Sequence, residues 1–312
     1  MSLCKSNCIS FTKIVWRLMK IISTRQVGNV LIPVVAGVLL VATFGFIEFV
    51  TGKEEKRVSV EDSCCLVYLA QNYDGQEEVA ASSNVIGWGL SWRKGSTEPV
   101  TDPGAAEMLA KYGAVYRGDV TTPEIYLTFD LGYEAGYTAQ ILDTLKEKNV
   151  KAIFFLLKNY VDRNPELVQR MIDEGHTIGN HSMTHKSLPT VDGATLDGEV
   201  DGFNTLMENQ FGYTTKFFRP PCGEYNESVL SALQQKGYTT LFWSFAYKDW
   251  DKNGAKGGDY AYKNIVSKLH NGMVILLHST TPDNAEALPK VIDSARSQGY
   301  SFGTPEKLYN NR

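Results

Sequence analysis

The chain has 312 residues, of which 43% are hydrophobic and 21% are charged, which is ordinary for a globular protein with a sizeable core. Its formal net charge is −4, and residues 1–50 hold five basic residues and one acidic residue, so the remainder carries about −8. This charge argues against a nucleic-acid-binding surface. The five cysteines are too few and too irregularly spaced for a disulfide framework in a chain of this length.

Residues 26–47 contain no charged side chain and are rich in valine, leucine, isoleucine and alanine. As a helix they would cross roughly 30 Å, which is the thickness of the hydrocarbon layer of a membrane. Basic side chains precede them, at Lys5, Lys13, Arg17, Lys20 and Arg25. The positive-inside rule therefore predicts a cytoplasmic tail over residues 1–25, a transmembrane anchor over 26–49 and an extracytoplasmic remainder. A cleaved signal peptide is the alternative, although the apolar run is long for one.

Residues 50–115 are predicted to form a stalk and an N-terminal arm. No hydrophobic period is sustained up to about residue 83, and turn-forming residues then surround Trp88 and Trp92. We expect these two tryptophans to pack on the domain that follows, rather than to bind a sugar.

From residue 116 to the C-terminus, short apolar runs alternate with amphipathic segments, which predicts a parallel sheet with helices outside it. Strands are predicted at residues 125–129, 152–157, 177–180, 217–219, 239–244 and 273–278, and near Tyr300. Helices are predicted at residues 138–148, 165–174, 194–209, 227–236, 260–270 and 285–298, the last with Asn284 as its N-cap. This periodicity does not distinguish a barrel from an open sheet.

The first of these strands ends on a carboxylate, in the sequence Ile-Tyr-Leu-Thr-Phe-Asp130-Leu-Gly-Tyr-Glu134. Parallel α/β folds keep their chemistry at the carboxyl ends of their strands, so Asp130 is a candidate catalytic residue. Capping of the next helix is the alternative role. The motifs for dinucleotide binding, phosphate-binding loops, serine hydrolases and zincins are absent from the sequence.

Four later segments carry further polar residues that could act with Asp130. They are His181-Ser-Met-Thr-His185, Arg219-Pro-Pro-Cys222-Gly223, Asp249-Trp250 and Leu-Leu-His278. In this order, the five segments resemble the five motifs of the polysaccharide deacetylase family, the NodB-homology domain of carbohydrate esterase family 4. The resemblance implies that residues 116–312 form the catalytic domain, with an irregular (β/α)7-type barrel.

Several segments look like one branch of that family, the peptidoglycan N-acetylmuramic acid deacetylases that prepare muramic δ-lactam in bacterial spore cortex. They are Tyr133-Glu134, Gly87-Trp88-Gly89, Asp249-Trp250 and the run Asp-Asn-Ala-Glu-Ala-Leu at residues 283–288. The resemblance therefore implies a substrate in peptidoglycan glycan strands and a link with sporulation.

Hydrolysis of an N-acetyl amide needs an activated water, stabilisation of the oxyanion and a proton for the departing amine. By resemblance, Asp130 is the general base and Arg219 holds its carboxylate. His278 is the general acid, and Asp249 orients its imidazole and raises its pKa. The backbone N–H groups of Gly223, Glu224 and Tyr225 are the candidate oxyanion donors, and Trp250 is assigned to substrate contact.

His181 and His185 are the candidate metal ligands. Their i, i+4 spacing lets two imidazoles meet one divalent ion, Zn²⁺ or Co²⁺, if the residues between them form a helical turn. His176 and His270 match no motif and are expected to be structural or exposed.

Two positions depart from the family pattern. Leu131 stands where most members carry a second aspartate, the third metal ligand, so metal binding should be weakened or dispensable; the muramic deacetylase branch also lacks that aspartate. Cys222 stands where many members carry an aromatic residue and this branch often carries arginine, which puts the substrate pocket in question.

Three functional hypotheses follow. The first is a membrane-anchored, extracytoplasmic hydrolase that removes the N-acetyl group of N-acetylmuramic acid in peptidoglycan. The second is an N-acetylglucosamine deacetylase acting on peptidoglycan or chitin-like chains. The third is a catalytically inactive glycan-binding protein, which only Leu131 supports.

Overall fold

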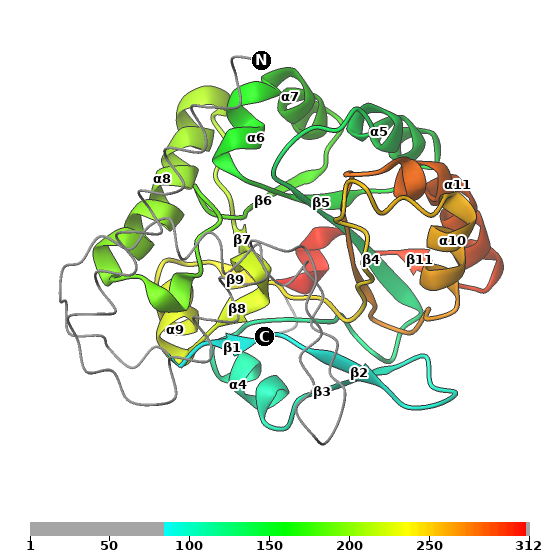
Figure 1. Cartoon of the computed structure of the whole chain (residues 1–312), viewed down its shortest axis with the longest axis horizontal. Helices are drawn as coiled ribbons and strands as arrows, with labels where there is room; N and C mark the ends of the chain where they lie inside the picture. Colours follow the sequence, from blue (N-terminus) through cyan, green and yellow to red (C-terminus); the bar gives the residue numbers. More distant parts are fainter. Residues whose placement is uncertain (1–83, 310–312) are drawn as a thin grey trace, which may run out of the picture. The chain divides into compact units, whose positions relative to one another are not determined.

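A parallel sheet forms the centre of the computed structural model, which describes residues 84–309 (Figure 1). Its strands follow the order β10-β4-β5-β6-β7-β9, and β11 pairs with the start of β4. The strands are β4 (Glu124–Leu131), β5 (Ala152–Leu156), β6 (Thr177–Asn180), β7 (Phe217–Phe218), β9 (Thr239–Thr240), β10 (Val274–Leu277) and β11 (Ser301–Phe302). The predicted α/β class and all seven predicted strand positions are confirmed.

The two edges of this sheet approach each other through the segment that follows β9. There, single parallel bridges join Val115 to Leu241 and Phe245 to Ile275, so the chain runs from the β7 side of the sheet to β10. The sheet therefore curls into a half-barrel whose last gap is crossed by isolated bridges. This is an incomplete form of the predicted irregular barrel.

The alternation of side chains along β4 separates the two faces of the sheet. Phe129 and Leu131 belong to the largest apolar cluster, which lies between the sheet and the helices. Tyr126 belongs to a smaller apolar cluster on the inner face of the curled sheet. Thr128 and Asp130 share the register of Tyr126, so the carboxylate that ends this strand is directed to the inside of the half-barrel.

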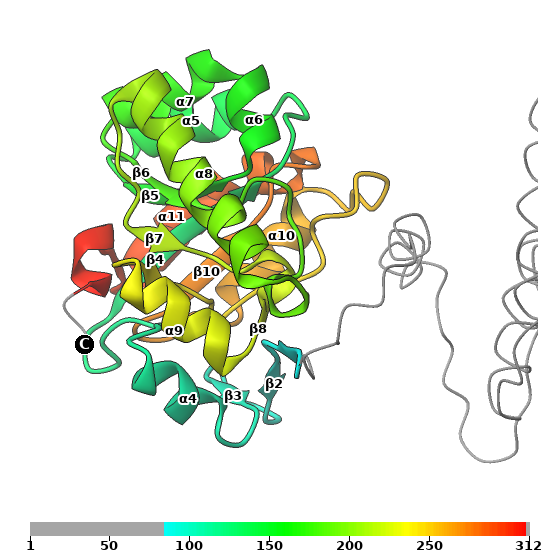
Figure 2. The same cartoon turned by 90° about the vertical axis from the view of Figure 1, so that its left-hand side faces the viewer.

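Helices lie outside the sheet (Figures 1 and 2). The six predicted helices are present, together with two that were not predicted, Ala105–Lys111 and Lys158–Arg163. Asp192 accepts a hydrogen bond from the N–H of Thr195 at the start of α8, and Asn226 accepts one from Val229 at the start of α9, as capping residues do. The helices are α4 (Ala105–Lys111), α5 (Thr138–Glu147), α6 (Lys158–Arg163), α7 (Pro165–Asp173), α8 (Gly193–Phe211), α9 (Glu227–Gln235), α10 (Gly258–Val266) and α11 (Pro282–Ser297); the 3₁₀ turns are η2 (Leu188–Thr190), η3 (Pro221–Gly223) and η4 (Pro305–Leu308).

The N-terminal arm packs against this domain from residue 84 onward. Its strands are β1 (Ile86–Gly87), β2 (Leu90–Trp92) and β3 (Pro99–Thr101), and β1 pairs with β8 (Glu224–Tyr225). Trp88 is 7% exposed, lies against Tyr116 and Phe242, and donates its indole N–H to the carbonyl of Trp243 at 2.9 Å. The expectation that this tryptophan is structural is therefore confirmed.

The last helix differs from its prediction. α11 begins at Pro282, three residues earlier than expected, because the proline sits at the first helical position where its missing N–H costs nothing. Thr281 is the N-cap, and Asn284 lies inside the first turn. The predicted anchor at residues 26–49 lies outside the described residues. Within residues 84–309, no helix has both the length and the apolar character to cross a membrane.

Candidate active site

Asp130 and His278 leave the sheet side by side at the carboxyl ends of two neighbouring strands. β4 and β10 are neighbouring parallel strands (Figure 2). Leu277 is paired with Phe129, so the next residue on each strand is one of the two candidates. Asp130 is 8% exposed, whereas the side chain of His278 is 20% exposed. A carboxylate and an imidazole nearly 150 positions apart in the sequence thus reach the same edge of the half-barrel.

Arg219 binds and positions the carboxylate of Asp130. Its Nη1 donates to Asp130 Oδ1 at 2.7 Å, and its Nε and Nη2 donate to the carbonyls of Leu241 and Phe242 at 3.0 and 3.2 Å. The guanidinium lies 4.1 Å from the centre of the Phe155 ring and is fully buried. Burial by itself raises the pKa of Asp130, but the charge of Arg219, followed by nearby histidines, lowers that pKa below its ordinary value. Asp130 is therefore held as a carboxylate.

Thr128, which sequence reasoning missed, joins this pair to the neighbouring strand. Its hydroxyl donates to the carbonyl of Ile275 on β10 at 2.7 Å and accepts from Arg219 Nη1 at 2.9 Å. Thr128 stands two residues before Asp130 on the same strand face. The period-two alternation of β4 was thus a signal that could have identified it.

Asp249 fixes the imidazole of His278. Asp249 Oδ1 accepts from His278 Nδ1 at 2.8 Å, and Asp249 Oδ2 accepts from the backbone N–H of His278, also at 2.8 Å. Nδ1 is the protonated nitrogen in this arrangement, so Nε2 is directed toward the site. Burial lowers the pKa of His278, but the charge and hydrogen bond of Asp249 and the charge of Asp130 outweigh it, so the pKa is raised. An imidazole with a raised pKa is suited to donate a proton near neutral pH.

His181 and His185 also meet at this edge, but their geometry differs from the prediction. Their ring centres are 5.0 Å apart, although the segment between them is not helical. Ser182 and His185 adopt left-handed backbone conformations, with φ of +76° and +61°, and this fold of the loop brings the second ring back to the first. The helical turn that was the condition for a shared site is absent, but the two rings lie close together all the same.

A buried polar network supports the loop that carries these histidines. Asn180 Oδ1 accepts from the N–H of Ser182 at 2.8 Å, and Ser182 Oγ accepts from the N–H of His185 at 3.0 Å. Glu199, 4% exposed in the middle of α8, accepts from the backbone N–H of Thr184 at 2.7 Å. None of the three supporting side chains had a sequence signal, because each acts through a contact that only the folded chain creates.

The two imidazoles suit a divalent ion of the zinc type. His181 Nδ1 donates to the carbonyl of Arg219 at 2.8 Å, which leaves the lone pair of Nε2 on the side of Asp130, 3.7 Å from Asp130 Oδ2. Burial lowers the pKa of His185 to about 4 and also lowers that of His181, so both rings are neutral and able to coordinate. The described residues contain no cluster of three or more His, Cys, Asp or Glu side chains arranged around one point.

Leu131 does not take part in this site. It is 2% exposed and packs in the outer apolar cluster, on the face of β4 opposite to Asp130. Leu131 therefore supplies no ligand, and His181 and His185 are the two residues present here that could hold a divalent ion.

Two exposed aromatic side chains border the edge of the sheet where Asp130 and His278 lie. Trp250 is 55% exposed, and the centre of its ring is 6.2 Å from that of His278. Tyr133 is 41% exposed on the loop that follows β4. Aromatic rings placed like this offer an apolar face to a ligand.

The predicted oxyanion donors are already engaged in other hydrogen bonds. Gly223 and Glu224 donate their backbone N–H groups to the carbonyls of Pro220 and Pro221 within η3. Trp88 donates to the carbonyl of Gly223, and the ladder alternation from there makes Tyr225 a hydrogen-bonded partner of β1. The prediction that these three amides face a substrate is therefore not supported. This turn also needs its glycine, because Gly223 has φ of +66° and a Cβ there would lie 2.7 Å from Trp243.

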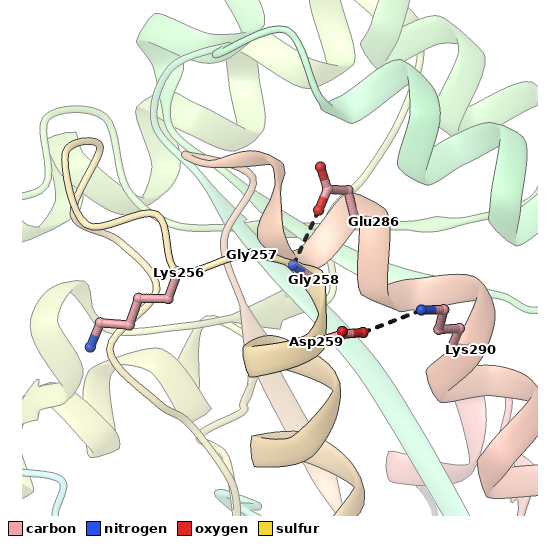
Figure 3. Close-up of a pocket in the computed structure, with 6 residues that line it drawn as sticks. All are labelled: Lys256, Gly257, Gly258, Asp259, Glu286 and Lys290. Carbon is pink, nitrogen blue, oxygen red and sulfur yellow. Dashed lines mark hydrogen bonds and ion pairs between the residues drawn. The ribbon is translucent and has the colours of Figure 1, made fainter.

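A separate hollow of about 360 Å³ lies where α10 begins beside α11 (Figure 3). Glu286 accepts the backbone N–H of Gly258 at 3.1 Å, and Lys290 pairs with Asp259 at 3.2 Å. In Figure 3 the side chain of Lys256 points away from these two pairs. These two contacts link α10 to α11 and use the side chains of Glu286, Asp259 and Lys290. We therefore assign no ligand to this hollow.

Comparison with known proteins agrees with this arrangement. A family model described as polysaccharide deacetylase matches residues 117–241. The peptidoglycan-N-acetylmuramic acid deacetylase PdaA of Bacillus subtilis is 39% identical over 246 residues, which cover 78% of this chain and 93% of that protein. A peptidoglycan-N-acetylglucosamine deacetylase of Bacillus cereus is 34% identical over 203 residues, which cover 64% of this chain and 73% of that protein.

Solved structures give the same result. That of B. subtilis PdaA, described as a family 4 carbohydrate esterase, aligns with a TM-score of 0.70 and 38% identity over 73% of this chain and 98% of that chain. A family 4 pseudoenzyme from Bacillus anthracis aligns with a TM-score of 0.57 and 27% identity over 63% of this chain and 69% of that chain. The fold and the site thus define a hydrolase of the carbohydrate esterase family 4 type. The chain belongs to the polysaccharide deacetylase family and hydrolyses N-acetyl amide bonds.

Proposed function

We propose that this protein removes the acetyl group from N-acetylmuramic acid in peptidoglycan, and that its product closes to muramic δ-lactam as in spore cortex. The observation that carries the proposal is the placement of Asp130 and His278 at adjacent strand ends, one held as a carboxylate and the other with a raised pKa. Similarity to PdaA over almost the whole of that relative supports the choice of sugar.

The reaction follows from the protonation states of the two side chains. Asp130 takes a proton from water while the water oxygen attacks the acetyl carbonyl carbon, and the carbonyl oxygen becomes an oxyanion. His278 then gives its Nε2 proton to the sugar nitrogen as the C–N bond breaks, which releases acetate and a free amine. Arg219 keeps Asp130 in place during both steps, and Asp249 stabilises the imidazolium.

His181 and His185 would hold a divalent ion beside Asp130. Such an ion, when bound, supplies Lewis acidity for the carbonyl and for the attacking water. The chain's own contribution is to keep both rings neutral and oriented, through the carbonyl of Arg219 and the network around Glu199. Exposed Trp250 would stack on a sugar ring next to the reacting acetyl group.

We also propose that residues 26–49 anchor the protein in the cell membrane, with the catalytic domain on the cell-wall side. The uncharged run and the basic residues before it support this arrangement. It would place the site among the glycan strands of peptidoglycan.

Mass spectrometry of defined glycans tests the proposed substrate. The full-length protein is incubated with muropeptides and with peptide-free glycans, with and without a chelator, and the loss of acetyl groups is assigned to each sugar. We expect loss from N-acetylmuramic acid, and Asp130→Asn should reduce the rate at least about 10²-fold. Loss confined to N-acetylglucosamine would favour the second hypothesis, which the similarity to the B. cereus enzyme supports.

An inactive glycan-binding protein is the other candidate function. The similarity to a family 4 pseudoenzyme is an observation that favours it. The intact hydrogen bonds among Asp130, Arg219, Asp249 and His278 argue against it. Glycan binding without acetate release in the presence of Zn²⁺ or Co²⁺ would establish this reading instead.

A further inference from the structure

Asn284 is a buried amide in the first turn of α11 whose contacts all lead to the Asp249–His278 pair. It is 2% exposed. Its Nδ2 donates to Asp249 Oδ2 at 2.7 Å and to the carbonyl of His278 at 2.8 Å. Its Oδ1 accepts from the hydroxyl of Tyr247 at 2.6 Å. One amide group thus contacts the carboxylate, the strand end that carries the imidazole, and a tyrosine of the loop before Asp249.

The orientation of this amide follows from its partners. A carboxylate oxygen and a backbone carbonyl can only accept, so the NH₂ group of Asn284 must face them. The hydroxyl of Tyr247 can then donate to the remaining oxygen. In the reversed orientation two acceptors would face each other, and the tyrosine proton would have to turn away. Tyr247 therefore donates to Asn284, and Asn284 and His278 both donate to the carboxylate of Asp249.

We propose that Asn284, supported by Tyr247, is a positioning residue that locks the carboxylate of Asp249 against His278. The inference rests on the proposed function only in naming the reaction that this pair serves. It gives a role to the Asp-Asn-Ala-Glu-Ala-Leu segment, whose asparagine the sequence suggested as a helix cap.

The physical basis is the burial of Asp249. Its side chain is 1% exposed, so water cannot replace a donor that is lost. Without Asn284, Oδ2 loses one donor and keeps the backbone N–H of His278, so the carboxylate is held less firmly and can rotate. Rotation would weaken the bond from His278 Nδ1, which sets both the tautomer and the direction of Nε2. Small displacements of a reacting group lower rates by up to roughly 10²-fold.

Several other charged groups face the same pair and must be considered with it. Asp130, Arg219, His181 and His185 interact electrostatically with His278, while Tyr247 lies close to both Asp249 and Asp283. Removing Asn284 leaves the charged side chains of this group in place and takes an acceptor only from the neutral hydroxyl of Tyr247. A changed protonation of His278 in the variant would therefore report the position of Asp249.

The test compares Asn284→Ala and Tyr247→Phe with the wild-type full-length protein. In Asn284→Ala we expect kcat to fall roughly 10-fold or more and KM to change less than about twofold. The reason is that loss of the amide affects proton transfer by His278 and not substrate binding. The alkaline limb of the kcat profile should move to lower pH, because His278 loses part of the interaction that raises its pKa. Tyr247→Phe should produce a smaller shift in the same direction.

Val291→Ala is the matched control. Val291 is fully buried in α11 and belongs to the apolar cluster, so its truncation should lower stability while the pH profile keeps its midpoint. A folded Asn284→Ala protein with a wild-type pH profile would overturn the inference. So would a shift to higher pH, or a shift of equal size in Val291→Ala.

NMR titration of the His278 ring, without substrate, separates this inference from the proposed function. A lower midpoint in Asn284→Ala supports the positioning role even if no glycan is deacetylated. An identical midpoint in the two proteins contradicts it even if the wild type proves to be an active deacetylase.

Discussion

His176 and His181 lie at opposite ends of β6, and only His181 is a candidate metal ligand. His176 precedes the strand and is buried against the ring of Phe154, whereas His181 follows the strand and faces His185. Calorimetric titration with Zn²⁺ should therefore find binding that is weakened at least about 10-fold in His185→Ala, because one of two ligands is lost. His176→Gln should bind as the wild type does. Equal zinc affinity in wild type and His185→Ala would rule out a shared site.

The catalytic side chains of the site could be predicted from the sequence, but the residues that position them through hydrogen bonds could not. Asp130 and His278 end apolar runs that read as strands, and parallel pairing brings such ends together. Asn284 and Glu199, in contrast, lie within helices, where nothing in the local pattern marks a buried polar contact. Their partners come from segments distant in sequence, so only the register of the folded chain reveals them.

At the scale of single elements, Glu134 secures the turn between β4 and α5. Its Oε1 accepts from the N–H groups of Gly136 and Thr138 at 2.6 and 3.3 Å, and its Oε2 accepts from the hydroxyl of Tyr160 at 2.7 Å. The carboxylate thus satisfies the first turn of one helix and ties it to a second. Glu134→Ala should lower the free energy of unfolding by about 1–2 kcal/mol in urea denaturation.

Glu147→Ala provides the comparison for this measurement. Glu147 is exposed at the last turn of α5, and its truncation should change stability by less than about 0.5 kcal/mol. Equal effects of the two substitutions would show that the bonds of Glu134 do not stabilise the turn.

The elements that escaped prediction are short and depend on long-range contacts. β1 and β8 have two residues each and exist because the arm pairs with the segment after Arg219. The predicted strand at residues 239–244 is regular only over Thr239–Thr240, because the chain then leaves β7 to cross toward β10. Hydrophobic period identifies elements that bury a whole face. The hydrophobic period says little about segments that pass from one neighbouring strand to another.

At the scale of the whole described domain, residues 84–309, the candidate catalytic residues Asp130 and His278 lie at the carboxyl ends of strands, and a buried histidine away from them affects stability. His176 is 4% exposed, and its Nδ1 accepts from the N–H of Ala152 at 3.3 Å. Within residues 84–309 its Nε2 has no hydrogen-bond partner and lies 3.9 Å from Glu174 Oε2. Burial lowers its pKa from 6.5 to about 4, since the charged form would lose its hydration.

This lowered pKa makes the fold sensitive to acid. Between pH 6.5 and about 4, His176 is protonated in the unfolded chain but not in the native protein. The free energy of unfolding is therefore unaffected by this residue above pH 6.5, and it falls as the pH decreases below that value. The loss from this residue reaches roughly 3 kcal/mol at the acid end. His176→Gln keeps an acceptor for Ala152 and cannot be protonated, so its unfolding free energy should decline less steeply in urea denaturation over this range. His181, His185 and His270 titrate in both proteins, so the difference between the two curves isolates His176. A difference that does not vary with pH would contradict the assignment of this acid sensitivity to the buried imidazole.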